Sequence, residues 1–126
     1  MNIKQIHHVA IIASDYQVSK HFYTEILGLP VIRETYRKER DSYMLDLQLG
    51  NSQIELFSFP NPPQRPTSPE ATGLRHLCFQ VEDFDAAIKH LESHGISCEA
   101  IRIDEKDNKR FTFFRDPDQL PLELHE

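Results

Sequence analysis

Residues 6–16 read IHHVAIIASDY, and residues 74–84 read LRHLCFQVEDF. Both stretches place a histidine before an apolar run and end on an aspartate followed by an aromatic residue. At the same offset, Ile54-Glu55-Leu56 aligns with Leu122-Glu123-Leu124. A repeat of this kind predicts a chain built from two copies of one supersecondary unit.

Each half has the same predicted order: a short apolar strand, an amphipathic helix and then three strands, which is the plan βαβββ. The plan predicts an α+β fold of two tandem βαβββ modules. The last two strands of each half are predicted hairpins, at 43–49 with 53–59 and at 110–115 with 120–125.

The helix of the second half is indicated by apolar residues at helical spacing, which are Phe84, Ala87, Ile88 and Leu91. Asp83 is its predicted N-cap and Gly95 its predicted stop. In the first half, Ser14 and Gln17 predict a capping box, and Gly28 ends the helix. The predicted apolar stripe of that helix consists of Val18, Phe22 and Ile26.

A proline-rich stretch at residues 60–73 separates the halves and holds five of the eight prolines. Proline cannot donate to a strand ladder, so this stretch is predicted to be an extended, semi-rigid linker. The predicted organisation is one domain over 1–126, with module 1 at about 4–59, the linker at 60–73 and module 2 at about 74–126.

The composition is that of a globular protein, because 39% of the 126 residues are hydrophobic and 27% are charged. The net charge of −6 has the wrong sign for general attraction to nucleic acid or anionic lipid, so neither partner is expected. The longest apolar run, residues 9–13, is too short to span a membrane. Two cysteines without zinc-site spacing suggest reduced thiols, and a cytoplasmic location is expected.

One histidine and one glutamate recur 47 residues apart in both halves, His8 with Glu55 and His76 with Glu123. Because strand residues alternate between faces, each of the four is predicted to point away from the apolar face that meets the helix. The adjacent His7 is predicted to face the other side. A carboxylate between two apolar neighbours is costly to bury unless it is paired or bound to a cation. The alternative is satisfied core histidines with surface glutamates, and the repeat favours a metal site over it.

Four segments resemble one protein family: IHHVAI at 6–11, SKHFY at 19–23 with LGL at 27–29, LRHLCF at 74–79, and FFRDPDQLPLEL at 113–124. The chain resembles the glyoxalase/bleomycin resistance protein/dioxygenase superfamily, the vicinal oxygen chelate proteins, over essentially its whole length. The resemblance implies that two βαβββ modules form an open cup around a divalent metal. It also implies a homodimer whose sites are completed at the interface.

Carried over from the family, the metal ligands are His8, Glu55, His76 and Glu123. Two imidazoles and two carboxylates suit Ni, Zn, Co or Mn, with Fe less favoured. By resemblance to glyoxalase I, the expected activity is that of a metal-dependent lyase or isomerase. The metal would act as a Lewis acid that stabilises an enediolate, and Glu123 would be the catalytic base. Glu123 would move a proton between adjacent carbons of a small hydroxycarbonyl substrate.

Three other members of the superfamily offer alternative functions. An extradiol-type iron dioxygenase needs open positions on its metal, and a fourth protein ligand argues against it. A metal-free drug-binding protein of the bleomycin-resistance type would lack the ligands that this chain retains. A fosfomycin-resistance thiol transferase has a three-ligand pattern.

Several further polar residues have a structural interpretation and a functional one. Cys78 is predicted to be a small buried thiol. Asp46 is predicted to be solvated or to support a metal ligand across the first hairpin. Solvated charge is the expected fate of four basic residues that could instead receive an anionic substrate group: Arg37, Arg40, Lys109 and Arg110.

Overall fold

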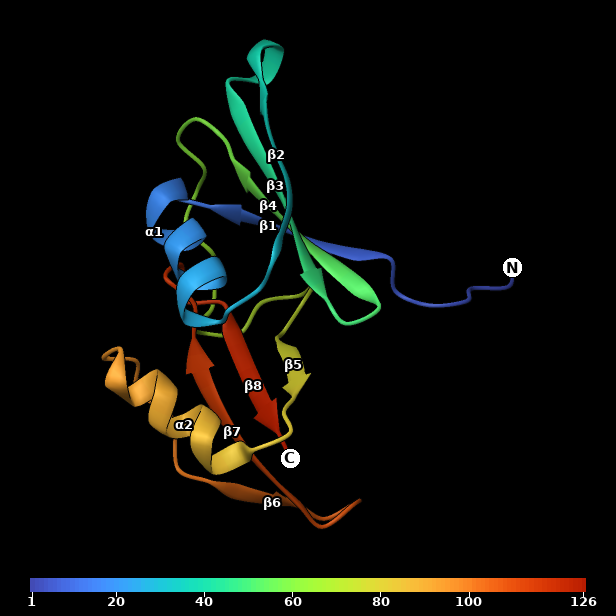
Figure 1. Cartoon of the computed structure of the whole chain (residues 1–126), viewed down its shortest axis with the longest axis vertical. Helices are drawn as coiled ribbons and strands as arrows, with labels where there is room; N and C mark the ends of the chain where they lie inside the picture. Colours follow the sequence, from blue (N-terminus) through green and yellow to red (C-terminus); the bar gives the residue numbers. More distant parts are fainter. The chain divides into compact units, whose positions relative to one another are not determined.

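The computed structural model describes residues 1–126, which divide into two compact units, Met1–Gln64 and Arg65–Glu126. Each unit contains one four-stranded sheet and one main helix (Figure 1). Neither sheet closes on itself. The α+β fold and the repeated βαβββ order are therefore confirmed.

The first unit follows the predicted order. Its elements are β1 (His8–Ala13), α1 (Tyr16–His21) continuing into the π-helical turn η1 (Phe22–Ile26), β2 (Val31–Arg37), the 3-10 turn η2 (Lys38–Arg40), β3 (Ser42–Leu49) and β4 (Ser52–Ser58). The strand order in the sheet is β1-β4-β3-β2, with β1 parallel to β4 and the other neighbours antiparallel.

The second unit repeats this arrangement. Its elements are β5 (Leu77–Gln80), α2 (Phe84–Ser93), β6 (Arg102–Asp104), β7 (Lys109–Arg115) and β8 (Pro121–His125). The strand order is β5-β8-β7-β6, and β5 is parallel to β8. In both units the first strand therefore pairs with the last, and both predicted hairpins are present.

The core of each unit lies on one side of its sheet, where alternate strand residues are buried. On β4, Ile54 and Leu56 are fully buried, and on β8, Leu122 and Leu124 are buried. The intervening Glu55 and Glu123 are only partly buried. Strand alternation thus places the apolar residues in the core and the carboxylates on the opposite face.

Helix α2 has the predicted limits. The Asp83 side chain accepts a hydrogen bond from the Ala86 N–H at 2.9 Å, as an N-cap does. Phe84 and Leu91 are buried, and Gly95 follows the helix with a φ of +75°.

The predicted start of the first helix is wrong, and so is one member of its predicted apolar stripe, Val18, whereas Phe22 is buried as predicted. Asp15, not Ser14, is the N-cap, and its side chain accepts from the Val18 N–H at 3.1 Å. Val18 is exposed, and the buried residues are Tyr16, Ser19, Phe22 and Tyr23. The later start and the wider π-helical turn after His21 change which residues face the sheet.

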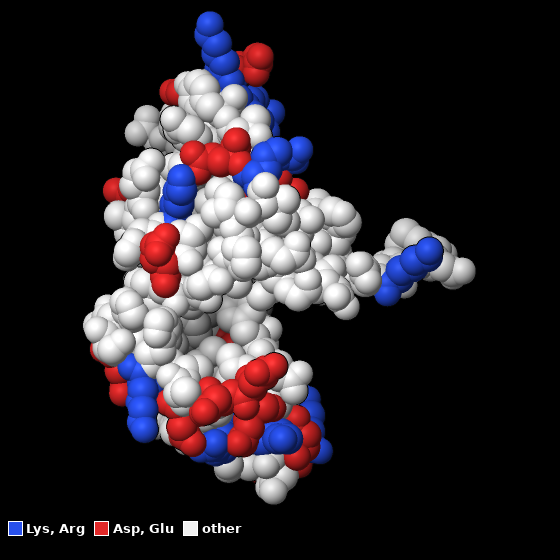
Figure 2. Space-filling model, viewed as in Figure 1, with Lys and Arg blue, Asp and Glu red and all other residues white.

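Arg110, on β7, contacts both helix α2 and the C-terminal residue of the second unit. Its guanidinium pairs with Asp85 in α2 at 3.0 Å and with Glu126 at 2.8 Å, and it lies over the Phe84 ring. Basic and acidic atoms are intermixed at this end of the unit (Figure 2). Hydrogen bonds from the Arg110 side chain and backbone N–H lower the pKa of Glu126 to about 2.

No helix of the chain combines the length and the apolar character needed to cross a membrane.

We expect Gly95→Ala to lower the free energy of unfolding by about 1 kcal/mol, because an L side chain is strained in the left-handed region. No atom lies within 4 Å of a Cβ built at Gly95, so the loss comes from the backbone and not from a clash. Urea denaturation measures it. Asparagine tolerates this conformation, so Gly95→Asn should lose less. Equal losses for the two variants would contradict the backbone explanation.

We expect Glu126→Gln to lower the melting temperature at pH 6 and to have little effect near pH 2. The folded pKa of Glu126 is depressed, so its carboxylate stabilises the fold above the unfolded pKa, and this contribution is lost as the pH falls toward 2. Melting curves followed by circular dichroism between pH 2 and pH 7 measure this difference. Glu105→Gln, at an exposed position, is the control. An equal decrease in melting temperature at every pH would show that the charge of the Glu126 carboxylate is not the cause.

Candidate functional site

In the first unit, His8 and Glu55 lie on neighbouring strands and point to the same side of the sheet. Strand β1 runs parallel to β4, with Ala10 opposite Glu55 in the register. His8 precedes Ala10 by two positions and therefore shares its face. The distance from His8 Nε2 to Glu55 Oε2 is 3.6 Å.

The second unit builds the same pair with the same register. Cys78 on β5 lies opposite Glu123 on β8, and His76 precedes Cys78 by two positions. The distance from His76 Nε2 to Glu123 Oε2 is 3.0 Å. The two halves of the chain thus each bring together one predicted histidine and one predicted glutamate, from the start of β1 or the residue before β5 and from the last strand of the unit.

All four side chains lie on the face of their sheet opposite the apolar core. Glu55 and Glu123 are the more buried partners, with side-chain exposures of 20% and 13%, whereas His8 is 41% exposed. Each carboxylate stands between two buried strand neighbours, so it is held close to the sheet while its oxygens face outward. The predicted alternation of faces is confirmed at these positions.

The donor set of each pair fits a divalent transition metal. Two ligand atoms at roughly 2.1 Å from one ion, in octahedral or tetrahedral arrangement, are separated by about 3.0–3.4 Å. The observed separation is 3.0 Å in the second unit and 3.6 Å in the first. In both pairs the histidine atom that faces the carboxylate is Nε2, a usual metal-binding nitrogen. The pairs therefore need little rearrangement to hold an ion.

Asp46 adds a further carboxylate beside Glu55, its register partner across the first hairpin. Of the two alternatives predicted for Asp46, the solvated one is wrong, because Asp46 is only 3% exposed and pairs with Arg33 at 2.9 Å. Its Oδ1 is buried and accepts no hydrogen bond. An unpaired carboxylate oxygen next to Glu55 makes this part of the sheet more favourable for a cation.

Cys78 lies beside the second pair as an exposed thiol, so the expectation of a buried cysteine is wrong. Partial desolvation at the sheet face and the neighbouring Glu123 carboxylate raise the pKa of Cys78 to about 11. The thiol is therefore protonated near neutral pH and donates a hydrogen bond to Glu123. This contact helps to orient the carboxylate.

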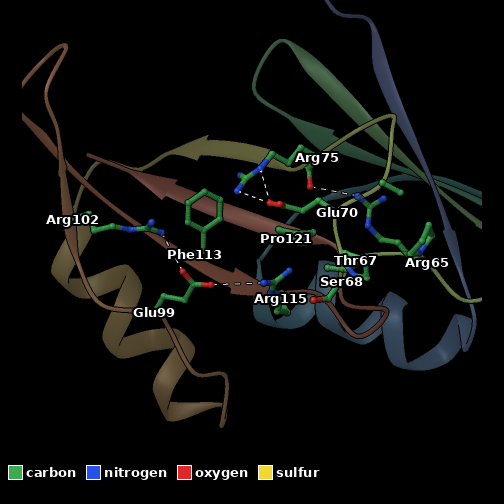
Figure 3. A pocket seen from close by; sticks show the side chains of 13 residues that line it. Arg65, Thr67, Ser68, Glu70, Arg75, Glu99, Arg102, Phe113, Arg115 and Pro121 are labelled. Carbon is green, nitrogen blue, oxygen red and sulfur yellow. Dashed lines mark hydrogen bonds and ion pairs between the residues drawn. The ribbon is translucent and has the colours of Figure 1, made fainter.

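The second unit also contains a cavity of about 300 Å³ next to His76. The Phe113 ring lines it and meets the His76 ring edge-on at a centroid distance of 5.1 Å. Arg75 also lines it (Figure 3), and its Nη1 lies 3.0 Å from His76 Nδ1. Three further arginines complete its basic lining: Arg65, Arg102 and Arg115.

None of these four arginines is among the basic residues that the sequence singled out. Of those residues, Arg110 is engaged by Asp85 and Glu126, and the Arg37 guanidinium lies 4.9 Å above the Phe57 ring. Strand alternation in the sequence could have indicated that Arg115 lies on the same sheet face as Glu123. Arg115 and Phe113 share a strand face, and Phe113 is the register partner of Glu123.

A third group of potential ligands consists of Asp104, Asp107 and His125, whose ligand atoms lie within 4.8 Å of one another. The sequence did not indicate this group, which depends on the turn between β6 and β7 approaching the end of β8. His125 Nε2 lies 3.3 Å from Asp107 and 4.0 Å from Asp104, so contacts between the imidazole and the two carboxylates account for the cluster.

Several proteins are similar to this chain over nearly their whole length. The uncharacterized Escherichia coli protein YaeR is 61% identical across 100% of this chain and 98% of its own. The crystal structure of a glyoxalase family protein from Enterococcus faecalis is 52% identical, with a TM-score of 0.90 and full coverage of both chains.

Two enzymes are more distantly similar. Human mitochondrial methylmalonyl-CoA epimerase is 29% identical over 75% of this chain and 56% of its own length. Lactoylglutathione lyase from Schizosaccharomyces pombe is 24% identical over 98% of this chain and 48% of its own.

A family model described as Glyoxalase/Bleomycin resistance protein/Dioxygenase superfamily matches residues 5–124. This match covers both βαβββ units and both His–Glu pairs. The chain belongs to the glyoxalase/bleomycin resistance protein/dioxygenase superfamily.

Proposed function

We propose that this protein is a divalent-metal-dependent enzyme that moves a proton at a carbon next to a carbonyl group of a small molecule. The metal ligands in this proposal are His8, Glu55, His76 and Glu123. The observation that carries it is the repetition of one contact, a histidine Nε2 facing a glutamate carboxylate on the exposed face of each sheet.

The charge and chemistry of the donor set support a metal. Two carboxylates neutralise a dication, and two imidazoles favour Ni, Zn, Co or Mn over Mg or Ca. Fe is less favoured because four protein ligands leave little room for oxygen and a second substrate. A divalent ion bound here supplies Lewis acidity, which makes the hydrogen on a carbon next to a coordinated carbonyl more acidic.

Glu123 is the proposed catalytic base. Its carboxylate is the less exposed of the two, and it lies between the buried Leu122 and Leu124. The Cys78 thiol donates to Glu123 and holds it in place. Glu123 can then accept a proton from one carbon and return it to the same or the adjacent carbon.

Both similar enzymes are compatible with this role, one a lyase and the other an epimerase. We favour a lyase of the glyoxalase I type acting on a thiohemiacetal or a related hydroxycarbonyl. The reason is the Glu at position 55, where the family resemblance suggests Gln in epimerases. An epimerase or isomerase is the second candidate, since the proton transfer is the same.

The assembly and location of the enzyme are part of the proposal. We propose a homodimer in which two equivalent sites are completed by modules from both chains. The free thiols of Cys78 and Cys98 favour a reducing compartment such as the cytoplasm.

Purified without chelator, the protein should contain about one Ni, Zn, Co or Mn ion per chain. Glu123→Gln and His76→Ala should each weaken metal binding at least tenfold, because the first replaces a charged ligand with a neutral one and the second removes a ligand. Elemental analysis and competition with a chromogenic chelator measure both quantities.

Asp107→Asn is the matched control for metal binding, because it alters the Asp104, Asp107 and His125 cluster and leaves the proposed ligands intact. A metal content that falls in Asp107→Asn and not in Glu123→Gln would overturn the ligand assignment. No metal after reconstitution would favour a metal-free binding protein.

Metal-loaded protein should convert methylglyoxal and glutathione to the thioester product, and Glu123→Gln should reduce the rate by about 10² or more. The rate is followed by thioester absorbance. Glu126→Gln, at a carboxylate paired with Arg110, should keep the wild-type rate. No turnover with any of the four metals would refute the lyase, and exchange of substrate hydrogen for solvent deuterium would then test the epimerase.

A further inference from the structure

The cavity in the second unit is lined by an excess of positive charge. Its charged residues are Arg65, Arg75, Arg102 and Arg115, with Glu70 and Glu99 as the acidic partners. Four guanidinium groups against two carboxylates leave two uncompensated positive charges, in a chain whose net charge is −6. The guanidinium groups come from the segment before β5, from β6 and from β7 (Figure 3).

Two of the arginines are held in position by contacts with the backbone and with aromatic rings. The Arg65 side chain donates to the backbone carbonyl oxygens of Leu74 and Arg75. The Arg102 guanidinium lies over the rings of Phe111 and Phe113, at 4.9 and 5.3 Å. Groups that are already fixed lose little conformational freedom when a ligand binds.

Some N–H groups of the cavity arginines remain available to donate hydrogen bonds to a ligand. Arg65 Nε is buried and has no hydrogen-bond partner, which is costly for a charged donor group. The ion pair between Arg115 and Glu99 is long, at 3.8 Å. The pairs formed by Arg75 with Glu70 and by Arg102 with Glu99 are shorter, at 3.0 and 3.1 Å, but solvent-exposed. Exposed pairs of this kind contribute about 0–1 kcal/mol, so an incoming anion can replace them.

We propose that this cavity binds an oxyanion, a carboxylate or a phosphate, through Arg115 and its neighbouring arginines. Planar guanidinium groups match both anions by paired N–H donors. The volume of about 300 Å³ suits a small ligand.

The position of the cavity connects the anion to the proposed reaction. Phe113 and Arg75 line the cavity and also contact His76. A ligand whose oxyanion occupies the cavity therefore extends toward the His76–Glu123 pair. The substrate class assigned by this geometry is a carbonyl compound that carries a carboxylate or phosphate. The assignment of a substrate class rests on the proposed function, whereas oxyanion binding itself does not.

The test is titration of the full-length protein with succinate, inorganic phosphate and neutral succinamide, with and without EDTA, followed by NMR of the backbone amides of Thr67, Ser68 and Phe113. We expect succinate or phosphate to bind in both conditions and succinamide not to bind. Arg115→Gln should weaken anion binding about tenfold, because it removes a charged donor. Arg40→Gln, which removes an exposed arginine of the first unit, should change the dissociation constant of the anion less than twofold.

The outcomes separate this proposal from the metal-dependent function. Tighter binding of succinate points to a carboxylate substrate, and tighter binding of phosphate points to a phosphorylated one. No binding of either anion overturns the proposal. Binding that EDTA abolishes and Arg115→Gln leaves unchanged also overturns it, because the anion is then a metal ligand. If Arg115→Gln melts below the assay temperature, Arg115→Lys tests the paired N–H donors instead, because lysine keeps the charge and lacks the planar guanidinium; it should still weaken anion binding. Anion binding by a protein that takes up no metal would refute the enzyme and leave the cavity assignment standing.

Discussion

The parallel pairing of the first and last strands of each unit determines where every candidate ligand lies. In β1 and β4, and again in β5 and β8, the register sets the residue two positions after the histidine opposite the glutamate. Because a strand alternates its faces, a shift of one residue in either pairing would bury the carboxylate in the apolar core. Burial of an unpaired charge is costly, so the core and the His–Glu contacts require the same register.

The two units use this shared register in different surroundings. In the first, the buried Asp46 stands next to Glu55 and contributes negative charge. In the second, the neighbour of Glu123 is the protonated Cys78, and the surrounding surface is basic. The two units therefore share the His–Glu pair and differ in the residues around it. The proposal assigns the catalytic base to Glu123, in the second unit, and a metal ligand to Glu55, in the first.

Arginine has two separate roles in the second unit. Arg110 is neutralised by two carboxylates and connects α2, β7 and the end of β8. The arginines of the cavity are less completely paired and lie near aromatic rings and backbone carbonyls. Local charge balance, and not the number of nearby basic residues, distinguishes the arginine that stabilises the fold from those available to a ligand.

The sequence by itself determined the repeat, the βαβββ plan, both hairpins and the face of each sheet on which the two His–Glu pairs lie. These features follow from periodicity, which is a local property of strands and of helix α2. The start of α1 and the residues it buries were not determined, because competition between Ser14 and Asp15 for the cap and the π-helical turn depend on packing against the sheet. The cavity arginines and the burial of Asp46 were decided only by the tertiary structure. They depend on side chains from distant segments meeting at one place, which no local pattern encodes.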